Sequence, residues 1–139
     1  MKKAMLYISI IMLLVVTVGC NDKKQEVKKE KKKVENKIKV DTNKDVIKNQ
    51  NLEVFTFTNT SLVYENSTSV LATIVTNTSS ETQYLKEFKI HVKDENGSEI
   101  VELTGFVGDN IKGNDSKQIV SSYGEDITHA ASIEYEIIR

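Results

Sequence analysis

The sequence predicts one all-β domain, a single antiparallel immunoglobulin-like β-sandwich of about seven strands, placed after an apolar leader and a charged linker. Three observations predict this class. From residue 52 onward, apolar and polar side chains alternate with the period of two that is typical of half-buried strands. Turn-forming Asn and Gly residues interrupt the alternation at short intervals. No long stretch of this region shows the apolar stripe of a helix, so we expect two packed sheets.

The first nineteen residues have the layout of a secretory signal peptide. Lys2 and Lys3 give a positive start, and an apolar run from Ala4 to Val18 follows. That run is shorter than the roughly twenty apolar residues that a membrane-spanning helix needs. We therefore expect residues 1–19 to be removed, and an uncleaved N-terminal anchor helix is the alternative.

The end of this leader, Val18-Gly19-Cys20, resembles the lipobox of bacterial lipoproteins, with Thr17 where Leu, Val or Ile is usual. In that family the cysteine thiol receives a diacylglyceryl group, and the leader is cut immediately before the cysteine. The resemblance implies cleavage between Gly19 and Cys20, and a diacylglyceryl anchor on Cys20 that holds the protein at the extracytoplasmic face of the cell membrane. Two acyl chains are enough for stable anchoring.

Residues 20–51 form a Lys-rich segment with eleven Lys, six acidic residues and no aromatic side chain. Such a segment buries too little apolar surface to offset the entropy lost on ordering, so we expect a disordered tether. Val27 and Val34 lie seven residues apart, but a coiled coil needs about three or four heptads. The lysines suit a solvated spacer, or attraction to anionic lipids and wall polymers, and both interpretations stay open.

The domain at residues 52–139 contains the expected strands. Alternation and β-branched residues predict them at 52–58, 61–65, 69–77, 84–94, 98–107, 117–122 and 129–138. Turn residues mark the breaks at Asn59-Thr60, Asn66-Ser67, Asn77 to Glu81, Asn96-Gly97, Gly108 to Asp115 and Gly124 to Asp126. The apolar faces of these strands predict core positions at Ile90, Val92, Leu103, Ile133, Tyr135 and Ile137.

The hairpin around Asn96-Gly97 has two possible registers. A two-residue type I′ loop pairs Val92 with Val101 and Ile90 with Leu103. This register is favoured because both pairs are apolar and lie on one face of the sheet.

The alternative is a three-residue loop at 95–97 with Gly97 in a bulge. It pairs Val92 with Ile100 and loses the second apolar pair. Its advantage is electrostatic, because the two-residue loop sets Asp94 opposite Glu99, a like-charge pair.

The domain resembles the FxLYD-type domains of bacterial lipoproteins. Val75-Thr76-Asn77-Thr78-Ser79 matches the V-x-N-x-S stretch that ends one strand in that family. Residues 90–97 stand where its F-x-L-Y-D-x-x-G stretch occurs, and Asp94 keeps the Asp of that motif. The resemblance covers residues 52–139, implies a sandwich fold, and brings no catalytic residues with it.

Composition excludes several classes of function for the domain. After Cys20 the chain has no Cys and no Met, which excludes disulfides, thiolate zinc sites and thioether copper sites. Residues 52–139 carry six basic and fourteen acidic side chains. Nucleic acid requires a basic face, so we expect no nucleic-acid partner.

The candidate chemical groups form no recognisable site in the sequence. His91 and His129 are the only imidazoles, and His91 alternates with apolar neighbours as an outward strand residue does. They lie far apart in sequence and without an acid-rich signature, so we expect no metal site. The oxygen-rich stretches 94–99 and 109–115 lack EF-hand spacing, and no Gly-x-Ser-x-Gly motif is present. We expect no catalytic residue, no cofactor and no enzyme.

These expectations together describe a membrane-anchored, non-enzymatic module that acts by contact with a protein partner at the cell envelope. One alternative is a small-ligand or ion-binding lipoprotein that serves a transporter. An aromatic-lined apolar pocket, or convergence of His91 and His129, would favour it. A second alternative is an inhibitor or immunity-type lipoprotein, which a rigid exposed loop at residues 108–115 would favour.

Overall fold

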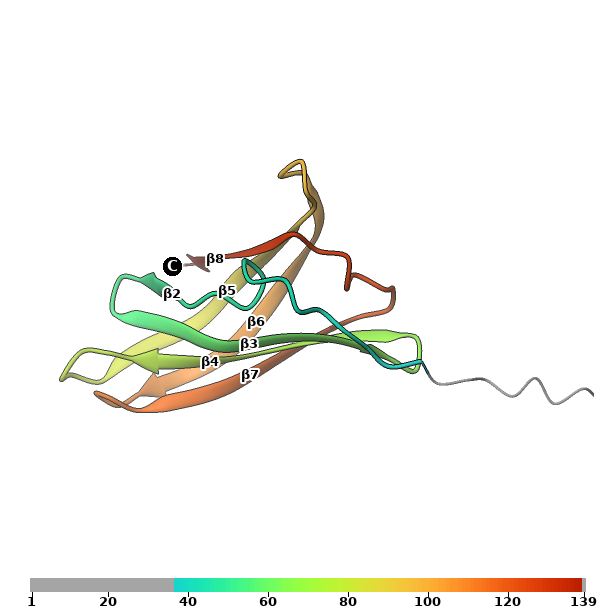
Figure 1. The fold of residues 1–139 in the computed structure, drawn as a ribbon. Coiled ribbons are helices and arrows are strands. Elements are labelled where there is room, and N and C mark those ends of the chain that lie inside the picture. Colours follow the sequence, from blue (N-terminus) through green and yellow to red (C-terminus); the bar gives the residue numbers. More distant parts are fainter. Residues whose placement is uncertain (1–36, 139) are drawn as a thin grey trace, which may run out of the picture. The chain divides into compact units, whose positions relative to one another are not determined.

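The structure is a computed structural model that describes residues 37–138, which form a β-sandwich (Figure 1). Sheet A contains β1 (Lys39–Val40), β3 (Phe55–Glu65), β4 (Thr68–Asn77) and β7 (Ser116–Tyr123) in that order, and β2 (Gln50–Leu52) pairs with the same edge of β3 as β1. Sheet B contains β6 (Glu99–Ile111), β5 (Gln83–Lys93) and β8 (Ser132–Ile138). All pairs are antiparallel, so the predicted fold class is confirmed.

The strand order is that of an immunoglobulin-like Greek key. Hairpins join β3 to β4 and β5 to β6 within a sheet, and the chain crosses between the sheets after β4, β6 and β7. With β3 as strand A, sheet A has the order A-B-E and sheet B the order C′-C-F. In the described part of the chain no helix is long and apolar enough to cross a membrane. The predicted signal peptide, with the predicted cleavage and lipid-attachment residues Gly19 and Cys20, lies outside the described residues.

The folded part begins before the predicted boundary at residue 52. The strand β1 pairs with the end of β3, β2 pairs with its start, and Val46 between them is completely buried. The prediction of a disordered tether is therefore wrong for residues 39–51. The average composition of the Lys-rich segment does not reveal that Val46 is buried or that β1 and β2 pair with β3. These two short strands cover an edge of β3 that would otherwise be unpaired.

The predicted turn at Asn59-Thr60 is also wrong, because β3 is one continuous strand there. The register shifts by one residue between Thr58 and Ser61, which is a β-bulge. Asn59 takes the left-handed backbone conformation at φ 51°. The extra residue directs Thr60 into the core, where its Oγ1 lies 2.7 Å from the hydroxyl oxygen of Tyr135.

The boundaries of two later strands differ from the prediction. β6 continues to Ile111 through a second bulge, where Gly108 has φ 62°, so the predicted loop at 108–115 is reduced to a turn. β8 begins at Ser132 because a turn precedes it, in which the Ala130 N–H donates to the Ile127 carbonyl at 3.1 Å.

The register of the β5–β6 hairpin is the favoured one, although its loop is not. Val92 lies opposite Val101, and Ile90 lies opposite Leu103. The predicted two-residue loop at Asn96-Gly97 is wrong, because a three-residue loop forms and a bulge in β6 then restores the apolar register.

Hydrogen bonds explain this combination. The Asp94 N–H donates to the Ser98 carbonyl at 2.9 Å, and the Gly97 N–H donates to the Asp94 carbonyl at 3.0 Å. Gly97 has φ 77°, as a bulge after a type I turn requires. The bulge also sets Lys93, not Asp94, opposite Glu99, which removes the like-charge pair.

The core lies between the two sheets. Five of the six predicted core residues are buried, namely Ile90, Val92, Leu103, Ile133 and Tyr135. The sixth, Ile137, is half-buried. Phe57 stacks on Tyr135 with ring centroids 4.3 Å apart, and Phe88 meets Phe57 edge-on at 4.9 Å. These rings come from β3, β8 and β5, so they join sheet A to sheet B.

Candidate functional site

The outer face of sheet B carries a ladder of opposite charges. Lys89, His91 and Lys93 of β5 alternate with buried Ile90 and Val92, so they point away from the core. Neighbouring strands bring carboxylates to the same face. The Nζ atom of Lys89 lies 3.0 Å from a Glu102 carboxylate oxygen.

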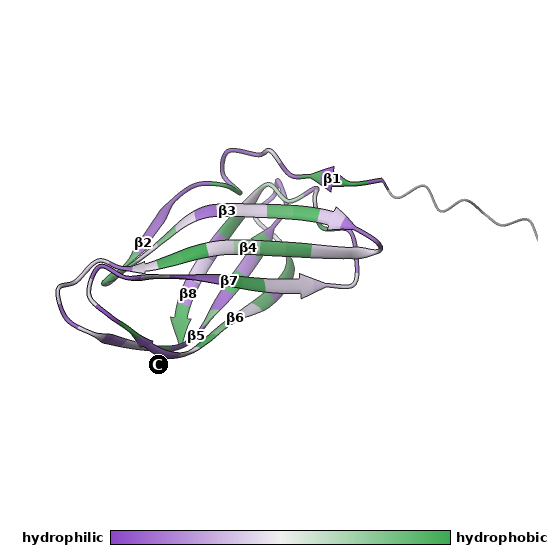
Figure 2. Ribbon diagram, turned by 90° about the horizontal axis from the view of Figure 1, so that it is seen from below, coloured by the Kyte–Doolittle hydropathy of each residue, from purple (hydrophilic) through white to green (hydrophobic). Residues whose placement is uncertain are grey.

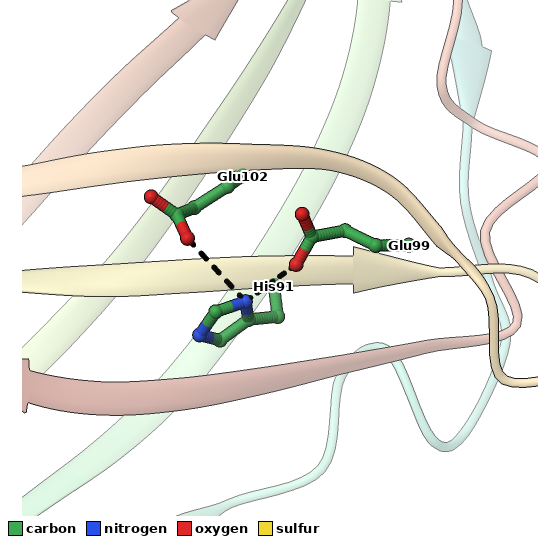
Figure 3. Close-up of side chains that lie close together, drawn as sticks. All are labelled: His91, Glu99 and Glu102. Atoms are coloured by element: carbon green, nitrogen blue, oxygen red, sulfur yellow. Dashed lines mark hydrogen bonds and ion pairs between the residues drawn. The ribbon is translucent and has the colours of Figure 1, made fainter.

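His91 lies at the centre of this face, between the other two strands of sheet B. Its Nδ1 atom lies 2.6 Å from Glu99 Oε2 and 3.9 Å from Glu102 Oε2, both on β6. Figure 3 shows the two carboxylates reaching toward the same edge of the imidazole ring. On the other side, Nε2 lies 3.1 Å from Glu136 Oε2 on β8. We refer to His91, Glu99, Glu102 and Glu136 as the His91 cluster.

The cluster favours positive charge at its centre. The hydrogen bond with Glu99 raises the pKa of His91 above 6.5, with a further contribution from Glu136, while partial burial acts in the opposite direction. Glu102 likewise raises the pKa of Lys89. One imidazole nitrogen and two carboxylate oxygens, from His91, Glu99 and Glu102, lie within 4.8 Å of one another. The cluster therefore offers three potential ligand atoms to a cation.

The sequence pattern did not predict this cluster. The alternation placed His91 correctly on an outward face, but we expected both His residues to lack acidic partners. The signal was present in the favoured hairpin register, which sets His91 opposite Glu102. His129 is exposed in the turn before β8, and the potential ligand group found among residues 37–138 does not include it.

The outer face of sheet A has the opposite character, because none of its central side chains is charged. Cross-strand pairs place four residues from each of β3, β4 and β7 on this surface, which we call the neutral face. They are Thr56, Thr58, Ser61 and Val63 of β3, Val70, Ala72, Ile74 and Thr76 of β4, and Ser116, Gln118, Val120 and Ser122 of β7. Figure 2 shows these strands side by side, with β4 largely white and green.

Aliphatic side chains gather at one end of the neutral face. Val40 of β1 lies opposite Val63, which lies opposite Val70. Val40, Val70 and Val120 are 57%, 37% and 58% exposed. These valines form an exposed apolar patch beside the first described strand.

Two small clefts open on the domain. The more apolar one has a volume of about 240 Å³ and lies where β3 and β5 begin and β8 ends, with Phe55, Tyr84 and Ile137 among its lining residues. A second cleft of the same size is lined mainly by polar residues near Gln50 and Glu134. Small-molecule sites usually enclose about 300–1,000 Å³. Both clefts fall below that range.

Comparison with protein-family models and with curated proteins found no match. Among solved structures, the chain is similar to a crystal structure of a DUF1425 family member from Shewanella sp. pv-4. The TM-score is 0.43 at 11% sequence identity, and the alignment covers 73% of this chain and 95% of that chain. A likeness at this level says nothing about family or function, so the fold rests on the strand pairing described above.

Proposed function

We propose that the chain is a bacterial lipoprotein, anchored through a diacylglyceryl group on Cys20, whose β-sandwich acts without catalysis by binding a protein of the cell envelope. The leader and the lipobox-like Val18-Gly19-Cys20 support the anchor. The V-x-N-x-S stretch at Val75 to Ser79 supports an FxLYD-type domain.

The neutral face is the observation that carries this proposal. Residues 52–139 contain fourteen acidic and six basic side chains, yet none falls on the twelve positions of that face. Charged residues are depleted at the centre of protein interfaces. The reason is that burying a charge costs far more free energy than burying an aliphatic or hydroxyl group. The acidic remainder of the domain suits a partner protein whose contact surface is apolar at the centre and basic at its margin.

Anchoring makes such a contact effective. A lipid on Cys20 confines the domain to a thin layer beside the membrane, which raises its effective concentration against a membrane-bound partner. A modest contact area of serines, threonines and valines can then be sufficient for association.

The two alternatives have less support. The apolar cleft includes Phe55 and Tyr84, as a ligand site would, but its volume of about 240 Å³ is small. The stretch at 108–115 is strand as far as Ile111, and Asn114 N–H donates to the Asn77 carbonyl at 2.9 Å, so only a short, tied turn remains. Contact through the neutral face therefore ranks first.

Site-specific photo-crosslinking in living cells tests this proposal. A photoreactive side chain replaces Val120 on the neutral face, and the matched control replaces Phe106, which is 65% exposed on the outer side of sheet B. We expect a discrete crosslinked protein from position 120 and none from position 106. The crosslink should disappear when Val120-labelled protein also carries Cys20→Ala.

Introducing a lysine on the neutral face or on sheet B tests which face makes the contact. Val120→Lys should abolish crosslinking from a second neutral-face position such as Ser122, because it would place a lysine in the contact, whereas Phe106→Lys should not. Equal crosslinking from positions 120 and 106, or crosslinking that survives Val120→Lys, would contradict contact through this face.

A further inference from the structure

The two carboxylates beside His91 share a face only because of the bulge in β6. Glu99 and Glu102 are three residues apart, and in a regular strand residues at that spacing point to opposite faces of the sheet. The register shift gives β6 an extra residue at Ile100, so that Glu99 lies opposite Lys93 and Glu102 lies opposite His91. Bulges commonly re-aim a side chain beside a functional site.

We propose that the His91 cluster is a binding site for a first-row divalent metal ion, best suited to Zn²⁺, with His91 Nδ1 and the carboxylates of Glu99 and Glu102 as ligands. This site is independent of the proposed contact function, because it lies on sheet B and the neutral face lies on sheet A. It is assembled from β5 and β6, two rigid strands that the apolar register holds in place.

The separations between the ligand atoms fit an ion of this size. Bonds of about 2.0–2.1 Å in a tetrahedral site place ligand atoms about 3.4 Å apart. The distances from His91 Nδ1 to Glu99 and Glu102, 2.6 and 3.9 Å, lie on either side of that value. Small rotations of two exposed Glu side chains are therefore sufficient to seat the ion.

A carboxylate on the third strand orients the imidazole ring. Glu136 lies 3.1 Å from Nε2, so a neutral His91 with its proton on Nε2 donates to Glu136 and directs its Nδ1 lone pair toward Glu99 and Glu102. Carboxylate–histidine–metal arrangements of this kind recur in zinc proteins and fix the tautomer of the ligand. The His91 side chain is 19% exposed, which limits the other orientations of its ring.

The donor set and the local charge favour a transition metal over Mg²⁺. Imidazole is a ligand for zinc, copper, iron and nickel, whereas carboxylates alone suit magnesium and calcium. Three protein ligands leave a fourth position open to water or to a group from a partner. Lys89 is the resident competitor, because its Nζ atom lies 3.0 Å from Glu102, and a bound ion would take over that carboxylate.

Calorimetric titration with Zn²⁺ tests the site in the full chain, purified in detergent and treated with a chelator. The background carries Cys20→Ser so that no thiol competes for the ion. We expect one saturable site per chain. His91→Ala, Glu99→Gln and Glu102→Gln should each weaken binding by about tenfold or more, and Glu136→Gln by about 10–100-fold, as is usual for a carboxylate that orients a ligand.

Two variants serve as matched controls. His129→Ala removes the other imidazole. Glu134→Gln removes a carboxylate that lies opposite His91 on β8 but pairs with Lys93 and is not one of the three potential ligands. Both should bind Zn²⁺ as the parent does. Lys89→Gln should bind more tightly, because the competing ammonium group is gone. Thermal unfolding without metal identifies any variant that has lost its fold.

The NMR signals of the His91 imidazole ring show where Zn²⁺ binds, which an affinity measurement does not. In a two-dimensional NMR spectrum, Zn²⁺ should shift the imidazole signals of His91 and leave those of His129 in place. Unsaturable binding, equal affinity in the parent and His91→Ala, or a loss in Glu134→Gln as large as in Glu99→Gln would overturn the proposal. Lys89→Gln removes the ammonium group that pairs with Glu102 and leaves the carboxylate in place. Tighter Zn²⁺ binding in this variant would therefore show that Glu102 binds the ion and does not only support the fold.

Discussion

Single polar side chains hold the ends of the strands together. Asn77 is completely buried at the end of β4, and its Nδ2 donates to the carbonyls of Glu81 and Ile111 at 2.7 and 2.9 Å. Its Oδ1 accepts from the backbone and the hydroxyl of Ser79. The sequence pattern predicted a turn that begins at Asn77. The structure shows that its side chain connects that turn to the end of β6.

Replacing Asn77 by Leu should lower the free energy of unfolding by at least about 2 kcal/mol. The substitution removes the Asn77 partner of the Ile111 carbonyl and of the Ser79 backbone N–H, while the Glu81 carbonyl keeps the Ser79 hydroxyl as a donor. Each buried unpaired group costs about 1–3 kcal/mol. Urea unfolding measures the loss. Asn96→Ala, in the exposed β5–β6 turn, is the control and should change stability by less than about 0.5 kcal/mol. A loss at Asn77 no greater than this would show that the side-chain network is dispensable.

At the scale of the element, the strand β6 contains a glycine, Gly105, whose backbone lies close to the aromatic ring of Phe88. A Cβ atom added to Gly105 would meet the Phe88 ring at 2.2 Å, and Phe88 is completely buried among the core aromatics. Gly105 and Phe88 are cross-strand partners. The glycine is therefore needed for space, not for an unusual backbone conformation.

Gly105→Ala should destabilise the domain by about 1–3 kcal/mol, as overpacking of a core does. Gly124→Ala is a matched control, because a Cβ atom at that glycine meets no atom within 4 Å. Thermal unfolding of both variants measures the difference. Equal melting temperatures for the two alanine variants would contradict the packing argument. A second variant, Gly105→Ala with Phe88→Leu, should recover part of the loss if the clash with the ring is the cause.

The short strand β1 is held partly by an ion pair with the turn before β8. Lys39 pairs with Asp126, and this hydrogen bond, together with those from Thr128, lowers the pKa of Asp126 from 3.8 to about 2. A carboxylate whose pKa is lower in the folded state stabilises that state above its unfolded pKa. The contribution is lost as the pH falls from about 4 through about 2.

Hydrogen exchange of the β1 amides should therefore accelerate relative to that of β4 across this acidic range. Asp126→Asn should show the faster β1 exchange already at neutral pH. Asp109→Asn is the control, since Asp109 also has a lowered pKa, caused by Lys117, but lies away from β1. Parallel pH profiles for the β1 and β4 amides would show that the Asp126 pair does not hold β1.

At the scale of the whole molecule, a small core joins two sheets of different character. Sheet A turns the neutral face outward, with Glu65 at its end, and sheet B turns a charged face outward. Their inner faces share the Phe57, Phe88 and Tyr135 rings. A domain of about one hundred residues has a stability of only some 5–15 kcal/mol. A single large cavity between the sheets should therefore threaten the fold.

Ile133→Ala makes such a cavity, because Ile133 is 2% exposed on β8. It should lower the free energy of unfolding by about 2–5 kcal/mol. Val120→Ala removes an aliphatic side chain of similar kind from the exposed neutral face and should have little effect. Denaturant titrations of the two variants give the comparison. An unchanged midpoint for Ile133→Ala would show that the inter-sheet core does not limit stability.

The local sequence was sufficient to predict the fold class and part of the core that sheet B contributes. Alternation of period two is a property of neighbouring residues, so it identified the inward faces of β5, β6 and β8 before any pairing was known. The leader and the lipobox-like end are also local patterns, and the proposal of a lipid anchor on Cys20 depends on the sequence alone.

Only the tertiary structure decided where strands bulge and which residues meet across them. The bulge at Ile100 allows a three-residue turn while it keeps Val92 opposite Val101, and no local pattern predicts this combination. That bulge places Glu99 and Glu102 together beside His91, and the pairing of β3, β4 and β7 assembles the neutral face. The burial of Val46 was not predicted for a similar reason, since Val46 lies between β1 and β2, which pair with opposite ends of β3. Side chains on neighbouring strands become neighbours through backbone hydrogen bonding, which sequence proximity does not encode.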